Sequence, residues 1–293
     1  MSINIKKDRF NILHKLLFKL AGPFLSDELY AKYTMRRWFG EFNINEPKTF
    51  NEKLQWLKLN DRKNIYSRLA DKYAVKEVVA DIIGSKYVID THFVIDSTDE
   101  LKFEDLPDNF VLKTNNSSGG NIIVTDKNNF DFSNAKSKLK SWMKQNYYRQ
   151  GREWIYRDIK PKIICEKLLF DESGGIPSDY KIFCFHGVPK YIQVDLGRFV
   201  DHKRIFYDID WIKQPFNTLY EYCDQVVDRP INLNDMLEIA AKLSADITFC
   251  RVDLYSIPEI YFGEITFYPE NGVGPFTINE WDLKFGNLVK IIK

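Results

Sequence analysis

The chain has 293 residues and a hydrophobic content of 44%, so it is long enough to bury a core of ordinary size in two or three packed lobes. Its 42 basic and 41 acidic residues leave a net charge of +1, which gives no electrostatic reason to expect a nucleic-acid partner. The four cysteines are far apart, and the sequence shows neither a signal peptide nor an apolar run long enough to cross a bilayer. We therefore expect a cytoplasmic protein with reduced thiols.

The first predicted element is an amphipathic helix over residues 10–25, in which apolar side chains recur at helical spacing. We expect its apolar face to pack on the protein's own core, and the alternative is a peripheral contact with the inner face of the membrane. Further on, Thr49 and Glu52 form a capping box that predicts a helix over residues 52–59, and a second helix is predicted over residues 65–82. Residues 1–68 are thus predicted to be a helical N-terminal region.

From residue 87 the pattern changes to short apolar segments separated by turns, which is typical of strands. Because these strands come mostly as hairpins and the helices as separate blocks, we predict an α+β fold with antiparallel sheets. The predicted strands are 87–95, 109–113, 121–125, 162–169, 181–185, 190–195, 205–208, 248–255 and 259–267, with helices at 132–147 and 233–245.

The most informative segment is the predicted hairpin near the C-terminus. Strand alternation puts Arg251 and Asp253 on one face, and a turn near Pro258 brings Glu264 opposite Asp253 on that face. Two carboxylates beside a guanidinium suit Mg²⁺ that carries nucleotide phosphates. The alternative is a solvated strand face with a structural salt bridge.

A second candidate site follows the strand that ends at Lys113. The next residues form a loop of small side chains, which exposes backbone N–H groups as an anion site and lets phosphate approach closely. The alternative is a plain hairpin turn, and the segment is not a P-loop because no Gly-Lys-Ser/Thr and no helix follow it. The loop residues are Ser117, Ser118, Gly119 and Gly120.

A third cluster is a candidate for acceptor binding. Charged side chains gather after a predicted strand, where a basic group can bind a carboxylated sugar or its diphosphate carrier. Its members are Asp195, Arg198, His202, Lys203 and Arg204. His202 is either a general base for the amine or a surface histidine without a role. An aromatic and basic stretch over residues 147–156 is suited to covering ATP or stacking on sugar rings.

Taken in order, these segments resemble an ATP-grasp ligase. The family's helix-initiating Asp-Lys pair is Asp71-Lys72, and its lysine with a phosphate loop is Lys113 with residues 117–120. Its hinge strand for adenine corresponds to Glu166-Lys167. The resemblance implies nucleotide contacts by all of these and by Asp179 and Lys181.

The last part of the ATP-grasp pattern is an R-V-D strand followed by a strand with Glu-x-Asn before proline. Arg251, Asp253 and Glu264 fill these positions, whereas Thr266 stands where the asparagine is expected, so Asn271 or a water is expected to complete the metal site. The resemblance implies that Asp253 and Glu264 place Mg²⁺ on the phosphates of ATP. It also implies that Lys72 and Lys113 hold the α- and β-phosphates, and that Arg251 stabilises the transferring phosphoryl group.

The resemblance is sharpest to one branch, the TupA-like ATP-grasp proteins of bacterial surface-polysaccharide gene clusters. The segments that carry it are 47–59, 69–75, 151–154, 179–187, 191–195 and 264–269. It implies two ATP-grasp lobes, over residues 69–160 and 161–293. It also implies an amide ligase that joins an amino acid or amine to a uronic acid of a capsule, O-antigen or teichuronopeptide, with ATP and Mg²⁺.

Two other functions remain open at this point. A glycosyltransferase would also need a carboxylate-bound metal and aromatics, and it predicts a D-x-D motif in a Rossmann-like domain. Only Asp208-Ile-Asp210 fits that motif, and no βαβ series surrounds it. A non-catalytic nucleotide-binding module is the third possibility, and the intact set of Arg251, Asp253 and Glu264 argues against it.

Overall fold

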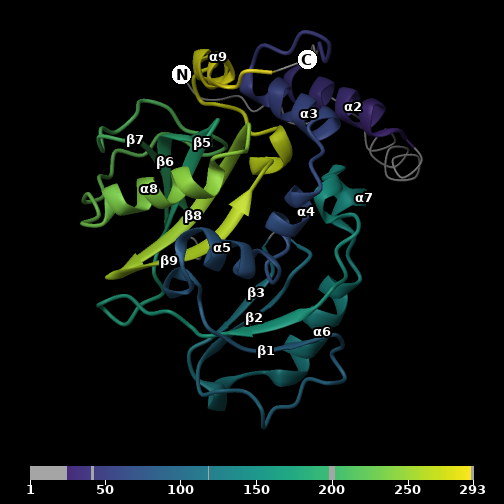
Figure 1. Cartoon of the computed structure of the whole chain (residues 1–293), viewed down its shortest axis with the longest axis vertical. Coiled ribbons are helices and arrows are strands. Elements are labelled where there is room, and N and C mark those ends of the chain that lie inside the picture. The colour runs from purple at the N-terminus through teal and green to yellow at the C-terminus, as the bar shows by residue number, and fades with distance from the viewer. Residues whose placement is uncertain (1–24, 41–42, 118, 198–201, 292–293) are drawn as a thin grey trace.

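A computed structural model describes residues 25–40, 43–117, 119–197 and 202–291. Two antiparallel sheets lie one beyond the other along the long axis, with helices around them (Figure 1). This architecture confirms the predicted α+β class. Residues 10–24 of the predicted amphipathic helix lie outside the described part of the chain. Within that part, no helix is long and apolar enough to cross a membrane.

The smaller sheet has four strands in the order β1-β4-β2-β3. They are β1 (Thr91–Ile95), β2 (Phe110–Thr114), β3 (Asn121–Val124) and β4 (Ile163–Glu166). Helix α6 (Phe132–Met143) packs on β2, and its Leu139 enters a core with residues of β2 and β4. Alternation along the strands leaves Lys113 and Glu166 on the other face of this sheet, toward the larger sheet.

The predicted lobe boundary at residue 160 divides this small sheet. Strand β4 pairs with both β1 and β2, so Glu166 lies on the same sheet as Lys113 and not with Asp253. The local sequence could not assign β4 to a sheet, because its pairing partners precede it by about 50 to 75 residues along the chain and the choice is made by tertiary packing.

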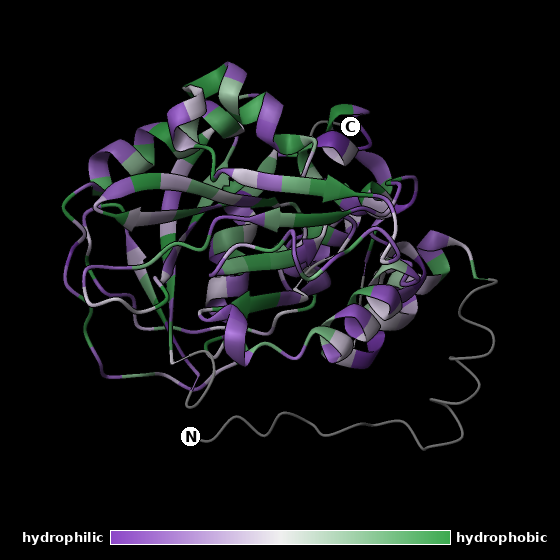
Figure 2. Ribbon diagram, turned by 90° about the horizontal axis from the view of Figure 1, so that it is seen from below, coloured by the Kyte–Doolittle hydropathy of each residue, from purple (hydrophilic) through white to green (hydrophobic). Residues whose placement is uncertain are grey.

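The larger sheet has five strands in the order β7-β6-β5-β8-β9. They are β5 (Asp179–Phe185), β6 (Val188–Leu196), β7 (Lys203–Asp208), β8 (Phe249–Ile257) and β9 (Glu259–Thr266). Helix α8 (Leu233–Ser244) packs against β5, β6 and β8, and the apolar positions of these strands form a core with it. Hydropathy therefore alternates along the strands (Figure 2), and the polar positions face away from α8.

Of the remaining helices, those over residues 27–39, 50–60 and 280–288 lie at the end of the molecule away from the smaller sheet, and the others lie between that end and the smaller sheet (Figure 1). The predicted capping box is present, since Thr49 Oγ1 accepts from the Glu52 N–H and the Glu52 carboxylate accepts from the Thr49 N–H. Helix α3, which it opens, packs closely on α9. The helices are α2 (Asp27–Phe39), α3 (Phe50–Asn60), α4 (Ile65–Ala70), α5 (Val75–Ile83), α7 (Tyr147–Gly151) and α9 (Glu280–Leu288), with single 3₁₀ turns at Ser85–Tyr87, Lys127–Asn129, Trp154–Tyr156 and Pro269–Gly272.

The helix predicted over residues 65–82 is interrupted at Asp71, which separates α4 from α5. Asp71 has extended backbone angles, and its carboxylate accepts hydrogen bonds from the N–H groups of Tyr73 and Ala74 at 2.8 and 3.1 Å. This local side-chain to backbone bonding competes with helix continuation. The interruption brings Lys72 out of the helix and into the space between the sheets.

Candidate nucleotide and acceptor site

A cleft of about 580 Å³ lies between the two sheets, which is the size of pocket that binds a cofactor or drug-sized ligand. Its walls come from the polar face of β5 to β9, from the ends of β2 and β3, and from α7 with the 3₁₀ turn that follows it. Predicted site residues that line it are Lys72, Lys113, Gly119, Asp179, Lys181, Asp195, His202, Arg204, Arg251, Asp253, Glu264 and Asn271.

The centre of the cleft is the pair formed by Asp253 on β8 and Glu264 on β9. They are direct partners across the two strands, as the alternation predicts. The register shifts between Asp253 and Leu254, which makes a bulge beside Gly263, where a Cβ atom would lie 3.0 Å from the Asp253 carbonyl oxygen. The strand pairing therefore holds two carboxylates on one face of the sheet.

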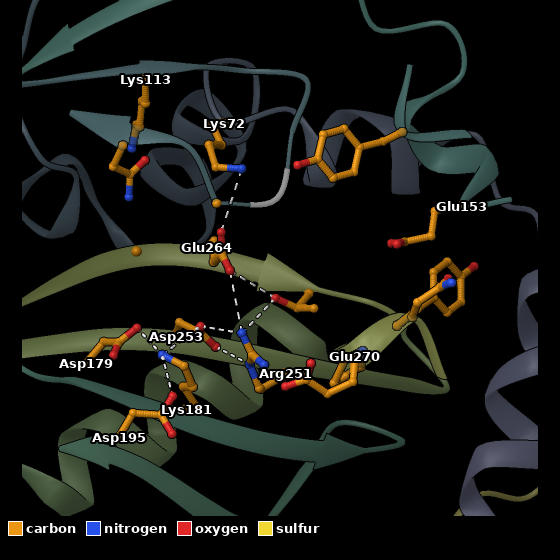
Figure 3. Close-up of a pocket in the computed structure, with 18 of the residues that line it drawn as sticks. Lys72, Lys113, Glu153, Asp179, Lys181, Asp195, Arg251, Asp253, Glu264 and Glu270 are labelled. Carbon is orange, nitrogen blue, oxygen red and sulfur yellow. Dashed lines mark hydrogen bonds and ion pairs between the residues drawn. The ribbon is translucent and has the colours of Figure 1, made fainter. Parts of the chain in front are cut away.

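Arg251 connects both carboxylates on this face. Its Nε and Nη2 donate to the two carboxylate oxygens of Asp253 at 2.7 Å each, and Nη2 lies 3.5 Å from Glu264 Oε1. Thr266, which stands where the family has asparagine, accepts from Arg251 Nη2 at 3.2 Å and donates to Glu264 Oε1 at 3.2 Å. Thr266 thus orients Glu264 and Arg251. Figure 3 shows Arg251 linked to the carboxylates of both Asp253 and Glu264.

The surrounding cations decide the charge of this pair. Burial raises the pKa of Glu264, but the charges of Lys72, Arg251 and Lys181 outweigh it and lower this pKa to about 2. Burial raises the pKa of Asp253, and the opposing charges of Arg251 and Lys181 only partly offset this effect. Glu264 is therefore fully ionised at neutral pH and is the stronger electrostatic ligand for a cation.

Lys72 links the loop after β2 to the carboxylate of Glu264. Its ammonium donates to the Ser117 carbonyl oxygen and lies 3.8 Å from Glu264 Oε2. Asp71 fixes the loop, since its Oδ2 accepts from Asn115 Nδ2 at 2.9 Å. Asp71 and Lys72 thus both bind the loop after β2. This contact explains why an Asp-Lys pair stands at the helix break.

The loop itself turns through two glycines with left-handed backbone angles. Gly119 has a φ of +75° and Gly120 a φ of +72°, which other residues rarely adopt. Strands β2 and β3 on either side form a hairpin in which Lys113 pairs with Asn121. Ser118, the remaining predicted residue of this loop, lies outside the described part of the chain.

Glu166 is held between two lysines on the small sheet. Lys113 Nζ lies 2.5 Å from one carboxylate oxygen, and Lys76 Nζ on α5 lies 2.6 Å from the other. Burial opposes ionisation, but these two charges lower the pKa of Glu166. Lys167, the next residue, borders a small recess beside Glu166, and its half-exposed ammonium lies 3.9 Å from Asp90 Oδ2.

An apolar recess of about 80 Å³ adjoins the cleft beside Lys113 and Glu166. It shares Lys113, Asn121, Tyr255 and Gly263 with the main cleft. Apolar walls next to lysines suit a purine base with attached phosphates. Its apolar walls are Ile89, Val111, Ile123, Leu168, Leu169, Ile176 and Pro177.

Asp179 and Lys181 lie on β5, next to the carboxylate pair. Lys181 is directly opposite Asp253 across the strands, and its Nζ is 3.5 Å from Asp253 Oδ2. The same ammonium donates to Asp179 Oδ2 and lies 4.0 Å from Asp195 Oδ2. Lys181 is 3% exposed, so it is a buried cation among three carboxylates.

The predicted acceptor cluster is partly assembled at the end of the cleft formed by β6 and β7. Asp195 and Arg204 are direct strand partners, and Arg204 Nε donates to Asp195 Oδ1 at 2.8 Å. Arg204 Nη1 also lies 3.1 Å from Glu270 Oε1, and its guanidinium stacks on Tyr220. His202 Nε2 is 3.4 Å from Asp195 Oδ1, so this histidine is part of the cleft.

Two other members of that cluster do not have a described position in the cleft. Lys203 neighbours Arg204 on β7, and alternation directs it to the opposite face of the sheet. Arg198 lies outside the described residues. Among the described residues, Glu270 and Tyr220 take places in this part of the cleft that the sequence did not reveal.

Asn271, predicted as a further metal ligand, lines the cleft but is engaged by a lysine. Lys58 Nζ donates to Asn271 Oδ1 at 2.6 Å and to the Asn271 carbonyl oxygen at 2.9 Å. The Lys58 ammonium would have to leave before Asn271 Oδ1 could ligate a cation. Thr266, by contrast, contacts both Arg251 and Glu264, and Asp253 contacts Arg251.

Several cleft residues come from the aromatic stretch over residues 147–156. Tyr147, Glu153 and Tyr156 line the cleft. Arg152 instead contacts Asp27 at 3.5 Å and stacks on Tyr148, so it holds α2 against α7. Glu153 and Lys76 were both missed as site residues, although each stands within a segment that carries the family resemblance or next to one.

The donor set fits Mg²⁺ shared with a nucleotide better than an all-protein metal centre. Over the described ranges, no group of three or more His, Cys, Asp or Glu side chains is arranged to hold a metal ion. Mg²⁺ is commonly held by one or two carboxylates and completed by phosphate oxygens and waters. Two adjacent carboxylates, with lysines on either side for phosphate, meet that requirement.

All four cysteines are free thiols, as predicted, and Cys165, Cys184 and Cys250 are buried in the strands. Burial raises the pKa of Cys184 to about 12. These three therefore behave as apolar core residues and not as nucleophiles.

Comparisons with known proteins identify the family of this chain. The family model "TupA-like ATPgrasp" matches residues 52–290. No curated protein sequence matches the chain. Solved structures with similar folds include D-alanine–D-alanine ligase from Bacillus anthracis complexed with ATP, with 14% identity, 84% of this chain and 74% of that chain covered, and a TM-score of 0.43.

Two further solved structures complete the comparison. N5-carboxyaminoimidazole synthetase from Staphylococcus aureus has 14% identity, 68% of this chain and 44% of that chain covered, and a TM-score of 0.38. D-alanyl-alanine synthetase A from Vibrio cholerae has 9% identity, 90% and 71% coverage, and a TM-score of 0.43. This chain thus spans less than half of the N5-carboxyaminoimidazole synthetase. The family assignment rests on the family model. The chain belongs to the TupA-like ATP-grasp family.

Proposed function

We propose that this protein is an ATP-dependent ligase that joins a carboxylate to an amine through an acyl phosphate. The observation that carries the proposal is the direct pairing of Asp253 with Glu264, with Arg251 and Lys72 in contact with them. Such a set is useful around a triphosphate and its metal, because it combines hard oxygen ligands with cations for phosphate oxygens.

The nucleotide has a consistent place in the cleft. Its base enters the apolar recess beside Glu166, and its phosphates extend past Lys113 toward Lys72 and the loop at Gly119. Mg²⁺ between Asp253 and Glu264 would neutralise charge on the β- and γ-phosphates. Arg251 then contacts the transferring phosphoryl group, where the fixed guanidinium stabilises charge without reorganisation.

The chemistry needs no nucleophile from the protein. A carboxylate oxygen of the acceptor attacks the γ-phosphorus, and ADP leaves with its electron pair. The amine then attacks the carbonyl carbon of the acyl phosphate, the C–N bond forms, and the C–O bond to phosphate breaks. The role of the chain is to align these groups and to supply the positive charge that the transfer requires.

We assign the carboxylate to a uronic acid of a bacterial surface polysaccharide, carried by a nucleotide or lipid, as the family resemblance implies. Arg204 supports this assignment, because it lines the cleft between Asp195 and Glu270, is 5% exposed and has Tyr220 stacked on it. A guanidinium beside an aromatic ring suits a carboxylated sugar. Either an amino acid or another amine is the second substrate.

The D-x-D-like segment that a glycosyltransferase would need does not form a metal site in the cleft. Asp208 Oδ1 accepts from the N–H groups of Asp210 and Ile212 at 3.1 and 2.9 Å, and its Oδ2 accepts from Gln214. The Asp208-Ile-Asp210 segment therefore closes a turn after β7. Its first carboxylate is occupied by that turn and does not line the cleft.

Calorimetric titration with a non-hydrolysable ATP analogue tests the proposal at the binding step. We expect binding with Mg²⁺ present and weaker binding after Mg²⁺ is removed with a chelator. Absence of binding at millimolar analogue would contradict the proposal. A steady-state assay would then show ADP release that requires both a uronic acid and an amine.

A further inference from the structure

Glu153 lies in the cleft apart from the phosphate contacts. It stands between α7 and the 3₁₀ turn Trp154–Tyr156, and its carboxylate points into the cleft. In Figure 3, Lys113 and Glu153 lie on opposite sides of Lys72 and Glu264. A nucleotide whose base lies beside Lys113 therefore places its γ-phosphate toward Glu153, where the second half of the reaction occurs.

The Glu153 carboxylate is available for a ligand. Among the described residues, no side chain donates a hydrogen bond to it and no cation lies within 4 Å of it. Among the cations, Lys58 has the largest electrostatic effect on Glu153. The Lys58 ammonium, however, donates its hydrogen bonds to Gly151 and Asn271. Glu153 thus differs from the other acidic residues at the centre of the cleft, which are paired.

Burial and several charged groups set the pKa of Glu153. Burial raises the pKa of Glu153 to about 7, the charges of Lys58 and Lys72 oppose this, and the charge of Glu264 adds to it. Three tyrosines whose own pKa values rise by burial and by the charge of Glu153 complete the surroundings, namely Tyr147, Tyr156 and Tyr268. The group therefore changes its protonation near neutral pH, as a base must.

We propose that Glu153 binds the ammonium group of the amine substrate and removes one proton from it before the amine attacks the acyl phosphate. This inference rests on the proposed ligase function. Tyr147, Tyr156 and Tyr268 also line the cleft and suit an organic cation. Aromatic faces attract ammonium groups, and this attraction adds to that of the Glu153 carboxylate. The second substrate is accordingly a primary ammonium compound such as an amino acid.

The proton transfers balance. An ammonium group carries three protons, and the amide nitrogen keeps one. Glu153 takes the first, which makes the nitrogen lone pair available for the carbonyl carbon. As the C–N bond forms and the C–O bond to phosphate breaks, the second proton goes to the departing phosphate, and Glu153 returns its proton to solvent.

Hydroxylamine distinguishes a role of Glu153 in amine binding and deprotonation from a role in forming the acyl phosphate. It is largely uncharged at pH 7.5, so it needs neither an ammonium subsite nor a base, and it traps an acyl phosphate as a hydroxamate. Wild type and Glu153→Gln are assayed with MgATP and UDP-glucuronic acid or UDP-galacturonic acid, with either hydroxylamine or each proteinogenic amino acid. Glu238→Gln is the matched control, since Glu238 is exposed on α8 behind the large sheet.

We expect Glu153→Gln to keep hydroxamate formation within about twofold and to lose amide formation with the amino acid by about 100-fold or more. In wild type, kcat/KM for the amino acid should rise with pH through about 7, and the variant should lack this rise. Glu238→Gln should match wild type in both reactions.

Two results would overturn the amine subsite while leaving the ligase function intact. One is an equal loss of hydroxamate and amide in Glu153→Gln, and the other is a normal rate with the amino acid. If the wild-type protein forms neither hydroxamate nor amide with any of these substrates, the ligase function itself fails and the subsite with it.

Discussion

Asp253 on β8 and Glu264 on β9 are direct partners across the hairpin, and Arg251 joins them by lying 2.7 Å from one carboxylate and 3.5 Å from the other. Two acidic residues opposite each other would repel without such a cation. In this hairpin the cation is part of the same motif, two residues before Asp253.

The first prediction concerns this pair. Asp253→Asn and Glu264→Gln should each lower turnover by about 100- to 1000-fold, because each removes a carboxylate that would hold Mg²⁺, and the charge of this cation stabilises the transferring phosphoryl group. The measurement is ADP release with a productive pair of substrates. Glu259→Gln is the matched control, since Glu259 is exposed at the start of β9. Near-normal ADP release in both site variants would show that the metal site lies elsewhere.

The second prediction concerns the small sheet. Glu166→Gln should destabilise the protein by about 3–5 kcal/mol, because it removes the buried anion that faces the largely buried ammonium groups of Lys76 and Lys113. Glu77→Gln removes an exposed ion pair with Arg68 on the same region and should cost less than about 1 kcal/mol. Urea denaturation gives both values, and equal losses would contradict this account of Glu166.

The pH dependence of this contribution has a definite sign. The folded-state pKa of Glu166 is lowered by its lysines, so its stabilisation is present above the pKa of the unfolded chain and is lost as the pH falls through the folded-state value. The stability gap between wild type and Glu166→Gln should therefore shrink in acid.

The third prediction has the opposite sign, because burial raises the pKa of Glu153 to about 7 from 4.5. Ionising this group costs the folded state free energy, so its protonated form favours folding at low pH, and this advantage is lost as the pH rises through 7. Glu153→Gln should gain about 2–3 kcal/mol of stability relative to wild type between pH 5 and pH 8. Denaturation curves at both pH values measure it, and an unchanged difference would contradict the raised pKa.

The fourth prediction concerns the close packing of α3 on α9. A Cβ atom on Gly286 of α9 would lie 2.2 Å from the Lys48 carbonyl oxygen at the start of α3. Gly286→Ala should therefore cost about 1–3 kcal/mol, although alanine favours a helix more than glycine does. Asn287→Ala, at an exposed position of the same helix, should be neutral or stabilising. A stabilised Gly286→Ala variant would mean that α3 and α9 are not in this close contact.

The sequence predicted the parts of the site that depend on local periodicity. Strand alternation alone placed Asp253, Glu264 and Arg251 on one face, and the structure has them there. The loop after Lys113 was predicted from its small residues and two glycines, and the structure has a hairpin loop there with left-handed angles at both glycines. In both cases the relevant geometry is set within about 15 residues of chain.

What the sequence did not reveal depends on tertiary contacts. Lys76 was missed because nothing local indicates that a lysine on α5 reaches Glu166, about 90 residues later. The break at Asp71 was missed because the apolar pattern continues through it, while the competing hydrogen bonds come from one side chain. Glu153 was not assigned a role since its surroundings come from α3, α7 and β9.

The central claim is that the chain forms an acyl phosphate on a carboxylate at the expense of ATP. A uronic acid labelled with ¹⁸O in its carboxyl group, incubated with ATP, Mg²⁺ and the amine, tests it directly by mass spectrometry of the phosphate produced. One labelled oxygen should move to inorganic phosphate, with ADP as the other product, because that oxygen bridges carbon and phosphorus in the intermediate. Unlabelled phosphate, or sugar transfer without consumption of ATP, would contradict the account.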